Sequence, residues 1–218
     1  MQEAFHTNAP LMVHISFAPP RIEEVLPFLR KGDILTHSFT GHTQRIIDGN
    51  GKLRPEAREA IDRGVLLDIG HGEGSFSFIV AKDLLKQGVK PYTISTDLHG
   101  GCIHGPTYDL PTTLSKFLNL GLSLEDVILR STTNPAKIIR GPEGLGTLKE
   151  GGVADIAVLE VKNGDFEFED AHKWILRGDQ KIVATNTITR GKIIEEIVKK
   201  RYPPYQGMSF SFPSHSIN

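Results

Sequence analysis

The chain has 218 residues, of which 39% are hydrophobic and 23% charged, and its formal net charge is −1. This composition is that of a globular protein, and domains of about 100–200 residues make one or two domains the expected number. The 25 basic residues are balanced by 26 acidic ones. No basic excess is present to neutralise phosphates, so nucleic acid is excluded as an expected partner.

Cysteine usage and the N-terminal sequence indicate the compartment. Cys102 is the single cysteine, so no intrachain disulfide or thiolate metal cluster can form, and a packing role is expected for it. The N-terminal residues have neither a basic region nor a long apolar core, and no apolar run approaches the ~18 residues that span a bilayer. We therefore expect a cytoplasmic protein with no membrane partner.

Short apolar runs alternate with amphipathic stretches in the first hundred residues. The pattern predicts buried strands at residues 11–17, 34–39, 65–69 and 92–96, and helices at 22–30, 55–63 and 75–87. Strands separated by helices at this spacing are typical of a parallel sheet with crossover helices.

The pattern changes after the fourth predicted strand. Helices are expected at 110–120 and 124–131, followed by a turn at Asn134-Pro135 and another short helix. Beyond Gly141 the pattern is all-β, with a hairpin turn predicted around residues 177–180. The segment 201–218 has no periodicity and is expected to be loose.

Each predicted strand has a polar residue in or just after its C-terminal half: His14, His37, His71 and Asp97. In barrels and open α/β sheets, the loops at this edge converge on one opening where sites are built. Imidazole and carboxylate are ligands that zinc accepts in catalytic sites. The pattern is therefore compatible with a metal site at this edge.

Structural interpretations of the same residues stay open. A histidine at a strand end is easily satisfied by backbone groups, and an aspartate after a strand often forms a turn or caps a helix. A polar pocket without metal is thus an alternative. The loop histidines His42, His99 and His104 are candidates for substrate contact or are simply exposed. The glycine turn at residues 72–74 is a weak candidate anion cradle at the next helix N-terminus.

Five segments carry a family resemblance: MVHIS, GDILTHSFTGH, DIGHGEGSFSF, ISTDLHG and TTNPAKIIRGPEGLGTLKEGGVADIAVLE. Together they resemble the amidohydrolase superfamily, most closely its dihydroorotase-like deacetylase branch of metallohydrolases. The similarity extends from about Leu11 to about Ile194.

The superfamily fold is a distorted TIM barrel. Its metal ligands are a His-x-His pair on strand 1, often a carboxylated lysine on strand 4, histidines on strands 5 and 6, and an aspartate on strand 8. By this resemblance His14 and His37 match the histidines of strands 5 and 6, and Asp97 matches the strand 8 aspartate. His71 follows strand 7 and matches a substrate-facing group, with Gly72 and His99 as further substrate-binding candidates.

The resemblance covers only strands 5 to 8 and the segment after them. The sequence contains no His-x-His, and too few residues precede Leu11 to supply strands 1 to 4. The expected fold is α/β: residues 1–140 form a partial (half) TIM-type βα barrel with four parallel strands. Residues 141–200 are expected to form a small β-sandwich segment, and residues 201–218 a loose tail.

The resemblance implies a metal-dependent hydrolase, with zinc as the expected metal. Small-molecule amides, cyclic amides or acyl esters are the implied substrates, as for a deacetylase or dihydroorotase-like enzyme, with Asp97 as general base and then general acid. Because the strand 1 and strand 4 ligands are missing, the alternative is a catalytically impaired remnant or assembly subunit. An open half barrel exposes apolar surface, so we expect a homo-oligomer or association with a separate N-terminal barrel half.

Overall fold

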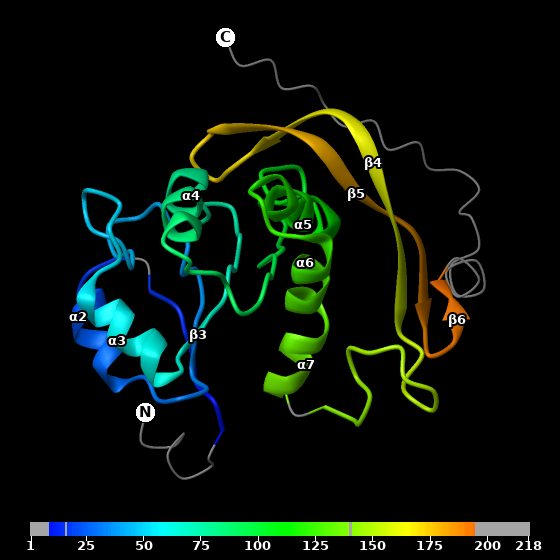
Figure 1. The fold of residues 1–218 in the computed structure, drawn as a ribbon, viewed down its shortest axis with the longest axis horizontal. Coiled ribbons are helices and arrows are strands. Elements are labelled where there is room, and N and C mark those ends of the chain that lie inside the picture. The colour runs from blue at the N-terminus through cyan, green and yellow to red at the C-terminus, as the bar shows by residue number, and fades with distance from the viewer. Residues whose placement is uncertain (1–8, 16, 140, 195–218) are drawn as a thin grey trace.

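A computed structural model describes residues 9–15, 17–139 and 141–194 of the chain (Figure 1). Short strands and helices come first and long antiparallel strands last. The elements in chain order are β1 (Met12–Val13), α2 (Ile22–Val25), the 3-10 helix η1 (Leu26–Phe28), β2 (Ile34–Leu35), α3 (Pro55–Arg63), β3 (Leu66–Leu67), α4 (Phe78–Lys86), α5 (Leu110–Asn119), α6 (Leu124–Ser131), α7 (Thr133–Ile139), β4 (Ile156–Glu169), β5 (Ile175–Thr189) and β6 (Lys192–Ile193).

The first sheet is parallel, in the order β1-β2-β3. The prediction of four parallel strands is wrong in its count, because in the predicted strand 92–96 only Thr93 pairs, forming a single parallel bridge with Asp68. On the other side of this segment the Ile94 N–H donates to the Arg130 carbonyl of α6 at 3.0 Å. The C-terminal end of α6 therefore takes the position that a further strand would occupy.

Local sequence signals explain where several helices begin and end. Helix α3 starts with Pro55 and ends at Arg63, as predicted from the sequence, and Gly64 at φ 100° closes it. Ser123 caps α6, accepting the Asp126 N–H at 3.1 Å. The helix predicted at 22–30 is shorter, because Pro27 has no N–H to donate and α2 passes into η1 after Val25.

The second sheet is a long antiparallel hairpin of β4 and β5, to which β6 adds a short third strand. The turn predicted at residues 177–180 is wrong, since these residues lie within β5 and pair with β4. Gly178 is needed there because a Cβ would collide with the Asn119 amide of α5. Among the described residues this is one antiparallel sheet, so the predicted β-sandwich segment is not confirmed.

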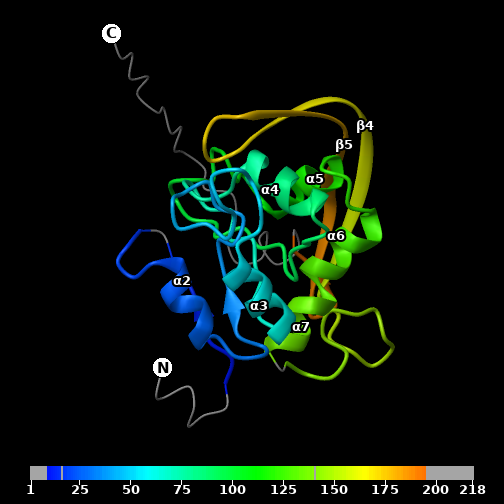
Figure 2. The same ribbon diagram turned by 60° about the vertical axis from the view of Figure 1, so that its left-hand side comes forward.

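The helices lie in two groups around the parallel sheet (Figures 1 and 2). Helices α2 and α3 lie on one side of the parallel sheet, whereas α5, α6 and α7 lie between that sheet and the hairpin (Figures 1 and 2). Phe76 and Phe117 pack at the centre with ring centroids 5.4 Å apart. Asp170 at the end of the hairpin accepts the Phe78 N–H at 2.8 Å, which fastens the hairpin to the start of α4.

None of the helices in the described ranges is both long and apolar enough to cross a bilayer. The predicted tail at 201–218 lies outside the described residues.

Candidate metal centre

The carboxyl ends of the parallel strands bring three predicted site residues to one pocket. His14 follows β1, His37 follows β2, and Asp97 follows the segment that bridges to Asp68. The pocket has a volume of about 400 Å³. It is lined by Met12, His14, Thr36, His37, Asp68, Gly70, Ser95 and Asp97. The expectation that these side chains meet at one sheet edge therefore matches the observed geometry.

His37 is buried and held in one tautomer. Its Nδ1 lies 2.5 Å from the Gly70 carbonyl oxygen. A carbonyl can only accept, so Nδ1 carries the proton and Nε2 keeps its lone pair. Burial lowers the pKa of His37; the bond to Gly70 opposes this, and nearby His14 adds to it. At neutral pH the imidazole is thus uncharged, the form that binds metal ions.

The two remaining donors lie close to His37. The His37 Nε2 is 3.8 Å from Asp97 Oδ2, and the Asp97 side chain is 54% exposed. The His14 ring lies 4.3 Å from the His37 ring between centroids, nearly perpendicular to it. Two imidazoles and a reachable carboxylate thus border the same space.

The backbone around these donors is strained. His37 and Asp97 have φ values of 52° and 46°, in the left-handed region that few residues other than glycine adopt. Gly70 and Gly72, in the turn after β3, also have positive φ. A Cβ on Gly72 would lie 3.1 Å from Asp97 Oδ2. The loops at this edge are therefore packed closely enough to fix where the two donors point.

The donor set fits a divalent metal chemically. The 3.8 Å gap between His37 Nε2 and Asp97 Oδ2 is too long for a hydrogen bond. It is within the span of two ligands that each lie about 2.1 Å from a shared zinc ion. Among the described residues, however, no group of three or more His, Cys, Asp or Glu side chains is arranged to hold a metal ion. His37, Asp97 and His14 as metal ligands therefore stay a prediction.

A network centred on Asp68 was missed by the sequence reasoning. Asp68 is 1% exposed. Its carboxylate accepts hydrogen bonds from Thr36 Oγ1 at 2.7 Å, Thr93 Oγ1 at 2.5 Å and Ser95 Oγ at 2.8 Å. Asp68, the residue after β3, is thus bonded both to Thr36, which precedes His37 in the chain, and to the segment 93–95. The signal was present, because a lone acid in the apolar run VLLDI requires buried partners.

None of the predicted substrate-binding residues His71, Gly72 and His99 lines this pocket, although Gly72 lies against Asp97 at its border. His71 has no exposed surface; its Nδ1 is 2.9 Å from the Gly72 carbonyl and its Nε2 is 2.7 Å from Lys116 Nζ. The structure thus places His71 in the interior and not in the substrate-facing position implied by the resemblance. Gly72 is buried, whereas His99 is exposed in the loop after Asp97.

The other loop candidates also have defined places. His42 packs against His172 from the hairpin, with ring centroids 5.8 Å apart, and His104 is exposed. The weak candidate anion cradle stays a prediction, but the first N–H of the following helix α4, that of Phe78, already donates to the Asp170 carboxylate. The protein's own carboxylate occupies the position that an anion would take.

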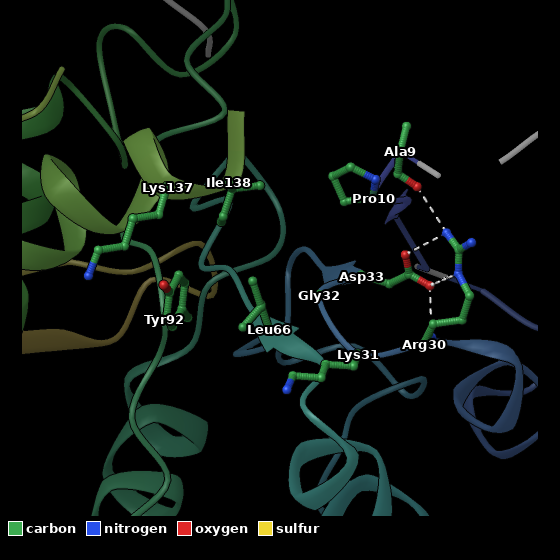
Figure 3. Close-up of a pocket in the computed structure, with 10 residues that line it drawn as sticks. All are labelled: Ala9, Pro10, Arg30, Lys31, Gly32, Asp33, Leu66, Tyr92, Lys137 and Ile138. Carbon is green, nitrogen blue, oxygen red and sulfur yellow. Dashed lines mark hydrogen bonds and ion pairs between the residues drawn. The ribbon is translucent and has the colours of Figure 1, made fainter. Parts of the chain in front are cut away.

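A second pocket, of about 450 Å³, lies at the amino ends of the same strands (Figure 3). Two of the charged residues that line it, Arg30 and Asp33, are bonded to each other. Asp33 accepts from Arg30 Nε and Nη2, both at 3.0 Å, and from the Leu11 N–H at 2.9 Å. Arg30 also donates to the Ala9 carbonyl. This end of the sheet is held together by an internal ion pair.

The sequence profile of the amidohydrolase family matches residues 1–194. The chain belongs to the amidohydrolase family. The chain is 36% identical over 188 residues to a deacetylase of Enterococcus faecalis, covering 85% of the chain and 51% of the relative.

Two solved structures resemble the chain closely. A crystal structure of an adenine deaminase gives a TM-score of 0.81 at 36% identity, with 84% of this chain and 50% of that chain covered. A crystal structure of a dihydroorotase gives a TM-score of 0.80 at 34% identity, with 88% and 52% covered. The chain thus spans about half the length of these relatives, and the likeness supports a partial barrel-type fold.

Proposed function

We propose that this chain carries part of the active site of a metal-dependent hydrolase that acts on amide, cyclic amide or acyl ester bonds. The observation that carries the proposal is the pocket at the carboxyl ends of the strands, where His37 Nε2 and Asp97 Oδ2 lie 3.8 Å apart beside the ring of His14. The family membership and the relatives named deacetylase and dihydroorotase support it.

His14, His37 and Asp97 are the residues that would hold a zinc ion. When bound there, zinc supplies Lewis-acid polarisation of the substrate carbonyl and lowers the pKa of water. Because the Gly70 carbonyl holds the proton on Nδ1, His37 offers its Nε2 lone pair to the pocket. Its low pKa keeps that lone pair available at neutral pH.

Asp97 is the proposed proton carrier. Its carboxylate is half exposed and so is accessible to water and substrate. It would accept a proton from the attacking water and later donate it to the leaving nitrogen or oxygen, acting as general base and then general acid. His99, exposed two residues further on, is a candidate for substrate contact.

A second candidate function is an impaired remnant or assembly subunit that depends on another chain. It is favoured by the lack of a three-ligand cluster among the described residues. Strand β1 is also an edge of the sheet, paired only with β2 in the described part of the chain, and Met12 in it is 59% exposed. A copy of the chain or a separate N-terminal barrel half is the proposed partner at this edge.

Zinc binding and turnover separate the two candidates. Calorimetric titration of the purified chain with zinc alone is expected to give near-stoichiometric binding, weakened at least tenfold in His37→Ala and unchanged in the exposed control His104→Ala. Chelator-sensitive hydrolysis of an N-acetyl amino acid, dihydroorotate or p-nitrophenyl acetate, reduced about 10²- to 10⁴-fold in Asp97→Asn, would establish the hydrolase. Absence of zinc binding would contradict it and favour the remnant.

A further inference from the structure

A buried lysine behind the candidate metal centre has no part in the proposed chemistry. Lys116 lies on α5 and has no exposed surface. Its Nζ is 2.7 Å from His71 Nε2 and 2.7 Å from the Pro106 carbonyl oxygen. Burial lowers the pKa of Lys116 to about 7, although the nearby carboxylates of Asp170, Glu169 and Asp109 act to raise it. The Lys116 amino group, whose burial costs free energy, is thus held against the ring of His71.

The direction of each hydrogen bond follows from the chemistry of the acceptors. The His71 Nδ1 faces the Gly72 carbonyl, which can only accept, so Nδ1 carries the proton. The Nε2 of His71 must then accept a proton from Lys116. An ammonium has three N–H bonds and a neutral amine has two, so either form can serve both His71 and Pro106. Burial, with the adjacent Lys116, lowers the pKa of His71 to about 3, which keeps the ring neutral.

His71 stands between the two glycines that border the candidate metal centre. The Gly70 carbonyl on one side accepts the Nδ1 proton of His37. The Gly72 carbonyl on the other side accepts from His71 and from Thr107 Oγ1, which is 2.9 Å away. Glycines have no side chain with which to fix their own conformation, and both have positive φ. The His71 ring is therefore one of the side-chain anchors of this turn, together with Thr107 and with Ser95, whose Oγ accepts the Gly70 N–H at 3.0 Å.

We propose that Lys116 is a positioning residue, which acts through His71 to hold the Gly70–Gly72 turn so that the Gly70 carbonyl keeps His37 in its metal-binding tautomer. A chain of contacts links Lys116 Nζ, the His71 ring, the turn and His37 Nδ1. The inference rests on the proposed function only for its zinc measurement. The tautomer itself is a property of the metal-free chain.

The direct test is the His37 tautomer in the metal-free protein. Long-range ¹H–¹⁵N NMR distinguishes a proton on Nδ1 from one on Nε2, and His37→Ala identifies the signals. The wild-type chain is expected to show the Nδ1–H form alone. Lys116→Met is expected to add a measurable Nε2–H form and to weaken zinc affinity about tenfold, the size of effect typical of groups that orient a metal ligand.

Three further variants separate positioning from packing. Leu114→Ala removes a buried side chain from the same helix without touching His71, so it is expected to lower stability and leave the His37 tautomer unchanged. Lys86→Met on the exposed face of α4 is expected to change neither. Thr107→Val removes a hydrogen bond to the Gly72 carbonyl at nearly constant volume, and we expect it to shift the tautomer in the same direction as Lys116→Met.

The outcomes are decisive in each direction. A folded Lys116→Met chain with His37 entirely in the Nδ1–H form would overturn the proposal, as would a tautomer shift of equal size in Leu114→Ala. If Lys116→Met does not fold, Thr107→Val supplies the same measurement. If the wild-type chain binds no zinc, the proposed function fails while the tautomer measurement still decides the role of Lys116.

Discussion

Two aspartates at opposite ends of the parallel sheet, Asp33 and Asp68, are buried to the same extent but are bonded differently. Each is 1% exposed. At the amino end, Asp33 faces the Arg30 guanidinium and two backbone N–H groups. Burial acts to raise the pKa of Asp33, but these hydrogen bonds outweigh it, and the pKa lies below its usual value. At the carboxyl end, the Asp68 carboxylate accepts hydrogen bonds from three neutral hydroxyl groups.

The difference shows how one small sheet separates stability from function. The Arg30–Asp33 pair ties the start of β2 to the chain before β1, and its charges cancel (Figure 3). At the other end His37 and Asp97 adopt left-handed backbone, a conformation that costs about 1 kcal/mol or more per residue. The amino end of the sheet is thus held by an ion pair, whereas at the carboxyl end His37 and Asp97 line an open pocket.

The largest expected effect is a loss of stability from a substitution at the amino end of the sheet. Asp33→Asn replaces an acceptor of four hydrogen bonds by an amide with one oxygen, so we expect the free energy of unfolding to fall by about 3 kcal/mol. Zinc affinity is expected to stay the same. Urea denaturation and calorimetry check the two quantities, with exposed Asp62→Asn on α3 as a control expected to change stability by less than about 0.5 kcal/mol. An equal loss of zinc affinity in Asp33→Asn would contradict the separation.

Buried Lys116 should make the free energy of unfolding depend on pH. The pKa of Lys116 is about 7 in the folded chain against a usual 10.5, so between these values the unfolded chain binds more protons. The free energy of unfolding of wild type relative to Lys116→Met should therefore rise with pH by about 1.4 kcal/mol per unit, or about 2 kcal/mol from pH 7.5 to 9. The carboxyl groups of Asp109, Glu169 and Asp170 face this lysine and act to raise its pKa. A difference that is flat with pH would mean that Lys116 titrates normally.

Asp68→Asn should act mainly on the site. The amide presents its own N–H donors to hydroxyls that donate to the native carboxylate, so the loops that carry His37 and Asp97 lose their common acceptor. We expect zinc affinity to fall about tenfold, equivalent to about 1.4 kcal/mol. Calorimetric titration with zinc measures it. Unchanged affinity in a folded Asp68→Asn chain would show that the network serves stability alone.

The smallest expected effect comes from two matched glycines. Gly72→Ala and Gly32→Ala both place an alanine at positive φ, at 58° and 87°, and each should cost about 1 kcal/mol of stability. A Cβ on Gly72 would lie against Asp97 Oδ2, whereas a Cβ on Gly32 has no neighbour within 4 Å. Only Gly72→Ala is therefore expected to weaken zinc binding. Thermal unfolding and zinc titration of both variants check this, and a loss in Gly32→Ala would count against it.

Much of the local structure was predictable from the sequence because its signals are local. The bounds of α3 follow from Pro55 and Gly64, and Ser123 marks the start of α6. The meeting of His14, His37 and Asp97 at one edge followed from the parallel arrangement of their strands. The fourth strand was over-predicted, because an apolar β-branched run does not show that the end of α6 will take its hydrogen bonds at Ile94.

Other features of the site depend on residues that are far apart in the chain. Nothing local indicates that Lys116, in an amphipathic helix, is buried against His71, 45 positions away. Gly178 and Asp179 have the composition of a turn, and only the approach of Asn119 from α5 explains why they lie within a strand. His71 follows its strand as the candidate ligands do, yet packing turned its ring into the interior.

The amino-acid sequence is sufficient to identify the family, the parallel arrangement of the strands and the polar side chains that follow them, because apolar periodicity and strand order are properties of consecutive residues. The folded structure is needed to show which nitrogen of His37 carries the proton, which hydroxyl groups bury Asp68, and that Arg30 neutralises Asp33 at the amino end of the sheet. These depend on hydrogen-bond donors and acceptors brought together from distant segments, and their directions are set when packing excludes water.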